Sequence, residues 1–253
     1  MSVDFTNEAE VREFLSGIRT DENQRVRVPH SHGDQCLRQR EPESCHRLAE
    51  FLHSVERDFP AAAKLLQLNC EKNGFTKSCA KLGTYHALGR GGVVVDLARA
   101  VELFSRSCLG AVTPDPASPA SVAASPTSVA ASPGSTTFTP SPEGCNNLGE
   151  MARQGRGFPG GQARPEVARR AFELACAGEV ASSCLQLSVM LMQAESRDMP
   201  RALLYAERAC HLGHPWGCIN AGRMLHLGDG VKPDPERARE LRERATLLAR
   251  AAH

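Results

Sequence analysis

The sequence has 253 residues, a length that fits one large domain or two ordinary ones. Its 30 basic and 29 acidic residues leave a formal net charge of +1, which gives no electrostatic signature for binding nucleic acid or an anionic membrane. Aromatic residues make up only 5%, so we expect a core of Ala, Leu and Val, which favours closely packed helices. No apolar run approaches the roughly 18 residues of a membrane span.

Residues 1–39 are expected to form a capping helix, at about 7–19, followed by a polar segment. The opening stretch is acidic and lacks a basic start and an apolar centre, so it resembles neither a secretory signal nor an Arg-rich mitochondrial presequence. His30 and His32 lie close to Cys36 and are candidate metal ligands. Their segment lacks helical periodicity, however, and we favour a solvated loop with no metal site.

The ten cysteines form two interleaved series. Neighbouring members such as Cys45 and Cys79, or Cys176 and Cys210, lie 34 residues apart. Fixed periods of this length are typical of stacked repeats of two short helices. The first series is Cys45, Cys79, Cys145, Cys184 and Cys218, and the second is Cys36, Cys70, Cys108, Cys176 and Cys210.

The first series marks one helix of each repeat, helix A. Three residues after each cysteine comes Leu, or Ala in the last repeat, and the next residue is always small. Apolar residues three apart mark the buried face of a helix, and the small residue lets a neighbouring helix approach closely. The small residues are Ala49, Gly83, Gly149, Ser188 and Gly222.

The second series marks the other helix of each repeat, helix B. An alanine stands eight residues before the cysteine, as Ala62 does before Cys70, and an aspartate four residues earlier is a good N-cap. Arg164 is the exception to the aspartate. Gly-x-Gly sequences between the two helices, as at Gly89 and Gly91, let the chain turn. A phosphate-binding loop would need a preceding strand, and here a helix precedes.

Residues 112–143 interrupt the repeats. They are rich in Ser, Ala and Pro and contain the sequence SVAASP twice. With so few bulky side chains the stretch cannot pack, so we expect a disordered surface insertion within a repeat domain of residues 40–253. A phosphorylated or partner-binding segment is the alternative.

The cysteine spacing predicts disulfides between neighbours. Where one helix B ends and the next helix A begins, a tight antiparallel connection brings two cysteines within the roughly 4.4–6.8 Å that a disulfide requires between Cα atoms. Ten cysteines allow many other pairings, and only the repeat register selects this one. Zinc is the alternative, but C-x2-C spacing is absent. The expected pairs are Cys36–Cys45, Cys70–Cys79, Cys108–Cys145, Cys176–Cys184 and Cys210–Cys218.

The Leu-Gly of helix A, the Gly-x-Gly turn and the Asp-x3-Ala of helix B resemble Sel-1-like repeats. The resemblance implies an all-α fold, an α-solenoid of five helix-turn-helix repeats cross-linked by disulfides. Such repeats occur in bacterial secreted proteins, some of them penicillin-binding, and in animal factors that assemble cytochrome c oxidase. The segments FPAAAKLLQLNCEKN, SCAKLGTYHALGRGG and ERACHLGHPWGC resemble the animal group. The repeats are expected at roughly 40–77, 78–111, 144–181, 182–216 and 217–250.

The resemblance to the animal group implies a cytochrome oxidase assembly factor in the mitochondrial intermembrane space, an oxidising compartment. Its partners would be copper chaperones or other assembly factors. The alternatives are a thiol-disulfide reductase with weak haem binding, and a secreted penicillin-binding or β-lactamase-like protein. This chain departs from the group in two ways: it has no spare cysteine, and Asn146 replaces the His that usually follows the third helix A cysteine.

Cys36 and Cys45 are the candidate catalytic pair, because Cys36 follows no helix B and that disulfide should open most easily for exchange. Ser78 and Lys81 fit the S-x-x-K motif of penicillin-recognising enzymes. Because the partner motifs S-D-N and K-T-G are absent, we expect Ser78 to have a role at the start of a helix.

Met190, Met224 and His226 are the candidate haem ligands. Both methionines lie six residues after a helix A cysteine, and this repetition favours packing. No cofactor is therefore expected to be required. Trp216, the only tryptophan, is expected to be either an exposed contact or a cover for the final repeat.

Overall fold

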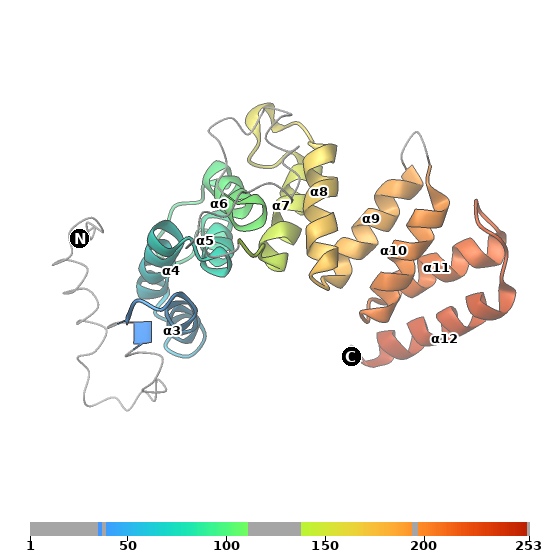
Figure 1. Cartoon of the computed structure of the whole chain (residues 1–253), viewed down its shortest axis with the longest axis horizontal. Helices are drawn as coiled ribbons and strands as arrows, with labels where there is room; N and C mark the ends of the chain where they lie inside the picture. Colours follow the sequence, from blue (N-terminus) through green and yellow to red (C-terminus); the bar gives the residue numbers. More distant parts are fainter. Residues whose placement is uncertain (1–34, 37–38, 111–137, 194–196, 252–253) are drawn as a thin grey trace, which may run out of the picture. The chain divides into compact units, whose positions relative to one another are not determined.

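The structure is a computed structural model of the whole chain, and it describes residues 35–36, 39–110, 138–193 and 197–251 (Figure 1). The predicted capping helix, His30, His32 and residues 112–137 of the predicted insertion lie outside the described residues. The predicted domain boundary at residue 39 therefore stays a prediction.

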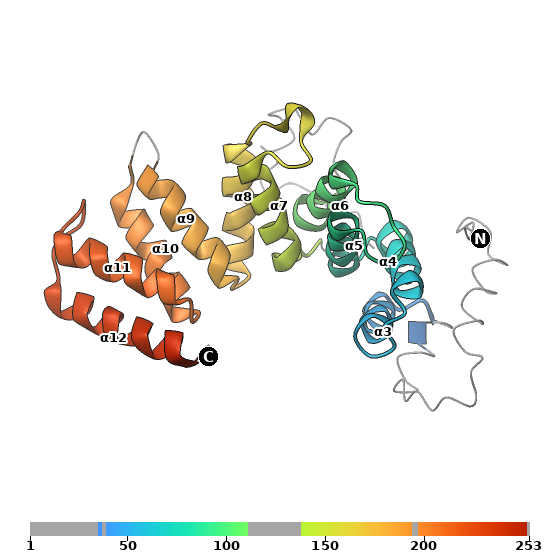
Figure 2. The same cartoon turned by 180° about the vertical axis from the view of Figure 1, so that it is seen from behind.

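The described residues form ten α-helices and no β-strand, which confirms the all-α prediction (Figures 1 and 2). Most helices have 13 residues, and the last has 17. None of them is long and apolar enough to cross a membrane. In chain order the helices are α3 (Pro42–Ser54), α4 (Phe59–Asn73), α5 (Thr76–Leu88), α6 (Leu97–Leu109), α7 (Pro142–Gln154), α8 (Pro165–Ala177), α9 (Ala181–Gln193), α10 (Met199–His211), α11 (Pro215–Leu227) and α12 (Pro235–Ala251).

The helices begin where the capping residues predict. At α4, Oδ1 of Asp58 accepts a hydrogen bond of 3.0 Å from the amide of Ala61, so one free amide of the first turn is satisfied. Arg164 precedes α8 without a side-chain cap. The same capping contact, at 2.9 to 3.1 Å, is made by Asp96, Asp198 and Asp234.

Helix α7 begins at Pro142, two residues before Gly144, where the pattern predicts that the repeats resume. The difference has a local cause. Ser141 is the N-cap, and its Oγ accepts a hydrogen bond from the amide of Gly144. Proline at the first helical position has no amide hydrogen that needs a partner.

Gly91 shows why the turn between the helices of a repeat requires glycine. Its φ is +71°, in the left-handed region. A Cβ here would lie 2.7 Å from the carbonyl oxygen of Phe59 and 2.9 Å from Cβ of Ala63. The turn therefore packs directly on α4, and the Gly-x-Gly sequence is explained by packing.

The chain divides into two compact units, Met1–Leu103 and Phe104–His253. In the first unit, α3, α4 and α5 enclose a core that includes Leu65, Leu82 and Tyr85, all at most 2% exposed. This unit contains the first two disulfides within its core.

In the second unit the helices pack through the small residues that the sequence singles out. A Cβ on Gly149 of α7 would lie 2.5 Å from the ring of Phe172, so α8 lies directly against α7 at this point. Met199 and Met224 form a further core between α10 and α11. The helix B alanines of the unit, Ala168, Ala202 and Ala238, are fully buried.

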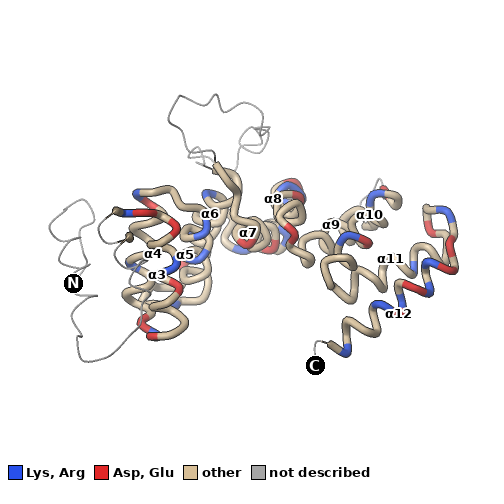
Figure 3. Tube along the Cα trace, turned by 60° about the horizontal axis from the view of Figure 1, so that its bottom comes forward, with Lys and Arg blue, Asp and Glu red and all other residues tan. Residues whose placement is uncertain are grey.

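Helix α12 ends the described repeats. Thr246 occupies the position that a cysteine holds in the other B helices, and it is exposed. Figure 3 shows Lys, Arg, Asp and Glu along much of this helix.

Candidate functional site

Five disulfides link the helices, and they join the neighbouring cysteines that the repeat register selects. The Cα–Cα distances are 4.6 to 4.8 Å. No cysteine is free. The prediction of a disulfide cross-linked repeat fold is therefore confirmed.

Four of the disulfides join the last turn of one helix to the first turn of the next. Cys70 lies three residues before the end of α4 at Asn73, and Cys79 lies three residues after α5 begins at Thr76. The cysteines that close α6, α8 and α10 are the second-to-last residues of their helices. A bond at this place fixes the angle between one repeat and the next.

The candidate catalytic pair is closed to solvent. Cys36 is 2% exposed and Cys45 is 4% exposed, against at most 1% for the other eight cysteines. The carbonyl oxygen of Cys36 accepts a hydrogen bond from the amide of Arg40. Exchange requires a thiolate to reach a sulfur atom, so the buried sulfur atoms of this pair would first have to become exposed. The assignment of the pair stays a prediction.

A buried polar contact joins α3 and α5, the first two A helices, beside Cys45 and Cys79. Nδ1 of His46 lies 3.0 Å from Oγ of Ser78, and Nδ2 of Asn69 donates to the same oxygen at 2.8 Å. Because Asn69 donates to this hydroxyl, the hydroxyl can donate its own hydrogen to His46. This arrangement requires a neutral His46 with an unprotonated Nδ1.

The surroundings of His46 favour that neutral form. Burial lowers its pKa from the ordinary value of 6.5. The carboxylates of Glu50 and Glu43 oppose this effect, and the ammonium groups of Lys77 and Lys81 add to it. A hydrogen-bonded neutral imidazole can therefore act as a structural link between α3 and α5.

Asn146 makes the corresponding contact in the second unit. It follows Cys145 directly, as His46 follows Cys45, and its Oδ1 accepts hydrogen bonds from Ser183 at 2.8 Å and Ser182 at 3.1 Å. The Asn at this position thus has the same packing role as the buried His46. Its departure from the pattern of the animal group is explained without a ligand.

The S-x-x-K motif is not arranged for nucleophilic catalysis. Ser78 is fully buried, and its Oγ is held by His46 and Asn69. Lys81 points to another partner, since its Nζ lies 3.6 Å from Oε1 of Glu50. A nucleophile needs a hydroxyl that the substrate can reach, so the role at a helix start is favoured.

The haem candidates are not brought together. Met224 is 1% exposed and packs in the core with Met199, whereas His226 is exposed on the same helix. Residues two apart on a helix do not face each other. Met224 and His226 therefore do not face one shared site, and we derive no step through haem; the assignment of haem ligands stays a prediction.

Met190 lines a groove of about 300 Å³ between α8 and α10. Leu187 and Leu191 of α9 line it with Met190, and Arg169 and Tyr205 lie at its sides. No histidine lines this groove. Nor does the described part of the chain gather three or more His, Cys, Asp or Glu residues that could hold a metal ion.

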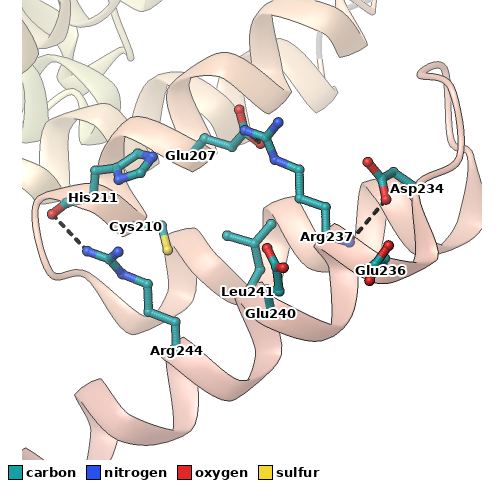
Figure 4. Close-up of a pocket in the computed structure, with 9 residues that line it drawn as sticks. All are labelled: Glu207, Cys210, His211, Asp234, Glu236, Arg237, Glu240, Leu241 and Arg244. Carbon is teal, nitrogen blue, oxygen red and sulfur yellow. Dashed lines mark hydrogen bonds and ion pairs between the residues drawn. The ribbon is translucent and has the colours of Figure 1, made fainter.

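A second groove, of about 470 Å³, lies between α10 and α12 (Figure 4). Arg237 reaches across it to Glu207, with an N–O distance of 2.8 Å. Arg244 donates to the carbonyl oxygen of His211 at the other end. Because both arginines bridge the helices, this groove is held by structural contacts.

Two further polar residues make contacts that no motif of the sequence indicates. Asn69 is buried and donates to Ser78, and Nδ1 of the half-buried His53 lies 2.6 Å from the hydroxyl oxygen of Tyr85. The one related signal in the sequence is a serine directly before the helix A cysteine in three repeats, at Ser44, Ser78 and Ser183.

The fold and the repeated disulfides define a class of protein, the Sel1 repeat proteins. The Sel1 repeat model matches five stretches of the chain, residues 42–73, 76–111, 142–176, 181–214 and 217–248. A protective antigen of uropathogenic Escherichia coli with this fold has a TM-score of 0.62 and 16% identity, over 85% of this chain and 39% of that one. A Sel1 repeat protein from Oxalobacter formigenes has a TM-score of 0.58 and 18% identity, over 84% and 74%.

Curated relatives narrow this class. Cytochrome c oxidase assembly factor 7 of Xenopus tropicalis is 35% identical, over 98% of this chain and 93% of the relative. The proteins of that name from Danio rerio and Homo sapiens are 37% and 34% identical, over 97% of this chain and 93% and 92% of the relatives. The chain therefore belongs to the cytochrome c oxidase assembly factor 7 family of Sel1 repeat proteins.

Proposed function

We propose that the protein is an assembly factor for mitochondrial cytochrome c oxidase and acts as a disulfide-stabilised repeat scaffold. The names of the relatives support the assembly role. One observation carries the scaffold role: all ten cysteines are paired in disulfides and are at most 4% exposed. Disulfides this well buried stabilise a fold and are poorly placed for exchange.

The proposed compartment is the mitochondrial intermembrane space. Disulfides persist in oxidising surroundings and are rare in the cytosol. Five of them in one chain support a compartment in which thiols are oxidised during folding.

The proposed partners are proteins, namely the chaperones that deliver copper or other assembly factors of the oxidase. Sel1 repeats are protein-interaction modules, and the match to the repeat model supports this kind of partner. Extended repeat surfaces bind partners without a deep catalytic cleft.

Complementation tests the proposal and separates it from a reductase. Cells that lack the protein would receive the wild type, Cys36→Ala/Cys45→Ala, or Cys70→Ala/Cys79→Ala as the matched control. Both pairs have a sequence separation of 9 and belong to the first unit. Cytochrome c oxidase activity and the amount of folded protein would be measured together.

A scaffold predicts that both variants lose oxidase activity only in proportion to the folded protein that they lose. A reductase that uses Cys36 and Cys45 predicts that the first variant alone loses activity while its folded amount is unchanged. If the wild type itself does not restore oxidase activity, the proposed function is wrong.

A further inference from the structure

The solvent-facing side of α11 differs in composition from the same side of the earlier A helices. Two residues before the helix A cysteine the first three repeats have charged residues, the fourth has serine and α11 has tryptophan. Five residues after the cysteine the order is Glu, Thr, Glu, Val and Arg. The residues at the first position are Glu43, Lys77, Glu143, Ser182 and Trp216, and those at the second are Glu50, Thr84, Glu150, Val189 and Arg223.

Four residues of α11 form one exposed stripe. Trp216, Ile219 and Leu227 are 61%, 39% and 64% exposed, and Arg223 between them is exposed as well. Their spacing of three and four residues places them on one face of the helix, opposite the buried face that includes Cys218. We call these four residues the α11 stripe. Three large apolar side chains gathered on one exposed face are typical of a docking surface.

Helix α9 extends the apolar area beside the α11 stripe. Ala181–Gln193 contains no Asp, Glu, Lys or Arg, in contrast to α12 (Figure 3). Met192 lies next to the stripe, since its Sδ is 4.0 Å from Nη2 of Arg223. Leu185 and Val189 of the same helix are only half-buried. Arg223 is therefore the only Asp, Glu, Lys or Arg of these two consecutive A helices.

The register of the repeats explains why the stripe is open. The residue that follows the helix A cysteine contacts the next A helix in both units, as His46 contacts Ser78 in the first and Asn146 contacts Ser183 in the second. Ile219 holds this position in α11. Among the described residues no further A helix follows α11, so Ile219 stays partly exposed.

We infer that the α11 stripe docks a helical segment of a partner protein that carries aliphatic side chains and one carboxylate. The inference rests on the proposed function and names the binding face of the scaffold. Arg223 is the only Lys, Arg, Asp or Glu of α11, and it has no ion pair among the described residues. A carboxylate is its complementary partner, and Trp and Arg dominate the binding energy of many interfaces.

The dimensions of the stripe fit a helix. From Trp216 to Leu227 the stripe runs along nearly the whole of α11, or roughly 16 Å at 1.5 Å per residue. A partner helix of about three turns covers this length with anchors at spacings of three and four residues.

A charge-swap binding experiment tests the inference directly. The probe is a synthetic amphipathic helical peptide with leucines along one face and a glutamate beside them, and its control has lysine in place of glutamate. Binding is followed by the fluorescence of Trp216, the only tryptophan. We expect the full-length wild type to prefer the glutamate peptide by about tenfold, and Arg223→Glu to reverse the preference. Equal affinity for both peptides would overturn the inference.

A cellular experiment separates this inference from the proposed function. Trp216→Ser introduces the residue that α9 has at the same place, and Leu204→Ser is the control because Leu204 is 62% exposed on α10, outside the stripe. We expect Trp216→Ser and Arg223→Glu to lower oxidase activity several-fold at an unchanged Tm, and Leu204→Ser to leave it unchanged.

If the stripe variants restore the oxidase as well as the wild type does, the inference fails and the proposed function stands. If the wild type does not restore it, the proposed function fails. Two other results would overturn the inference if the wild type does not bind the peptide. These are self-association of the chain, or binding to vesicles of anionic lipid, that Trp216→Ser abolishes. Either result would assign a different occupant to the stripe.

Discussion

Removal of the Cys108–Cys145 disulfide is expected to cost more stability than removal of Cys176–Cys184. Both pairs belong to the second unit, and all four cysteines are at most 1% exposed. The loss of buried side-chain contacts should therefore lower the free energy of unfolding by a similar amount in both variants. The pairs differ in the loop that they close, since their sequence separations are 37 and 8.

The difference follows from the entropy of the unfolded chain. With 37 residues in the loop the cross-link contributes about 3.8 kcal/mol, and with 8 residues about 2.5 kcal/mol. The expected difference in the free energy of unfolding is thus about 1.4 kcal/mol, or a factor of about ten in the equilibrium constant. Alanine replaces each cysteine, so that no hydroxyl is buried without a partner.

The assay is denaturant unfolding of both double-alanine variants and the wild type, followed by circular dichroism without reductant. The slope of the free energy with denaturant should be the same in both variants, which shows that the compared states expose similar surface. An equal loss in the two variants, or a larger loss for Cys176→Ala/Cys184→Ala, would refute the chain-entropy argument.

Three further results are expected. His46→Leu should cost about 1–3 kcal/mol because it leaves the buried hydroxyl hydrogen of Ser78 without an acceptor, whereas His46→Asn, the residue at position 146, should cost less; thermal melting compares the two variants. Burial lowers the pKa of His46 below 6.5, so just below pH 6.5 the unfolded chain binds a proton that the folded chain does not. The contribution of His46 to the free energy of unfolding should therefore be complete above pH 6.5 and decrease as the pH falls below it. The accompanying fall in Tm should be smaller in His46→Asn. Gly149→Ala should lower Tm because the new Cβ would collide with the ring of Phe172, and Ala177→Gly, at the exposed end of α8, is a control that creates no such contact.

Much of the fold was predictable because its signals are local. The period of the cysteines, the capping aspartates such as Asp58 and the turn glycines such as Gly91 act within a few residues of where they stand. The disulfide pairs followed once the repeat register was known. The start of α7 at Pro142 differs from the predicted Gly144, because the repeat pattern marks the cysteine whereas the helix begins at its Ser141 cap.

The polar contacts of the candidate site could not be predicted in the same way. The hydroxyl of Ser78 contacts His46 and Asn69, which lie on two other helices. The spacing of residues within one repeat does not indicate such a contact between helices. Of the haem candidates, Met224 and His226 lie close in sequence but on different faces of α11. Trp216 had two interpretations, and its exposure favours the exposed contact.

The Cys108–Cys145 disulfide also determines the result of a backbone cleavage between its two cysteines. Every peptide bond between residues 108 and 145 lies within the loop that this disulfide closes. A protease that cuts there would produce two polypeptides that remain one covalent molecule until a reductant is added. Cleavage of the segment would therefore leave Phe104–Leu109 tethered to α7.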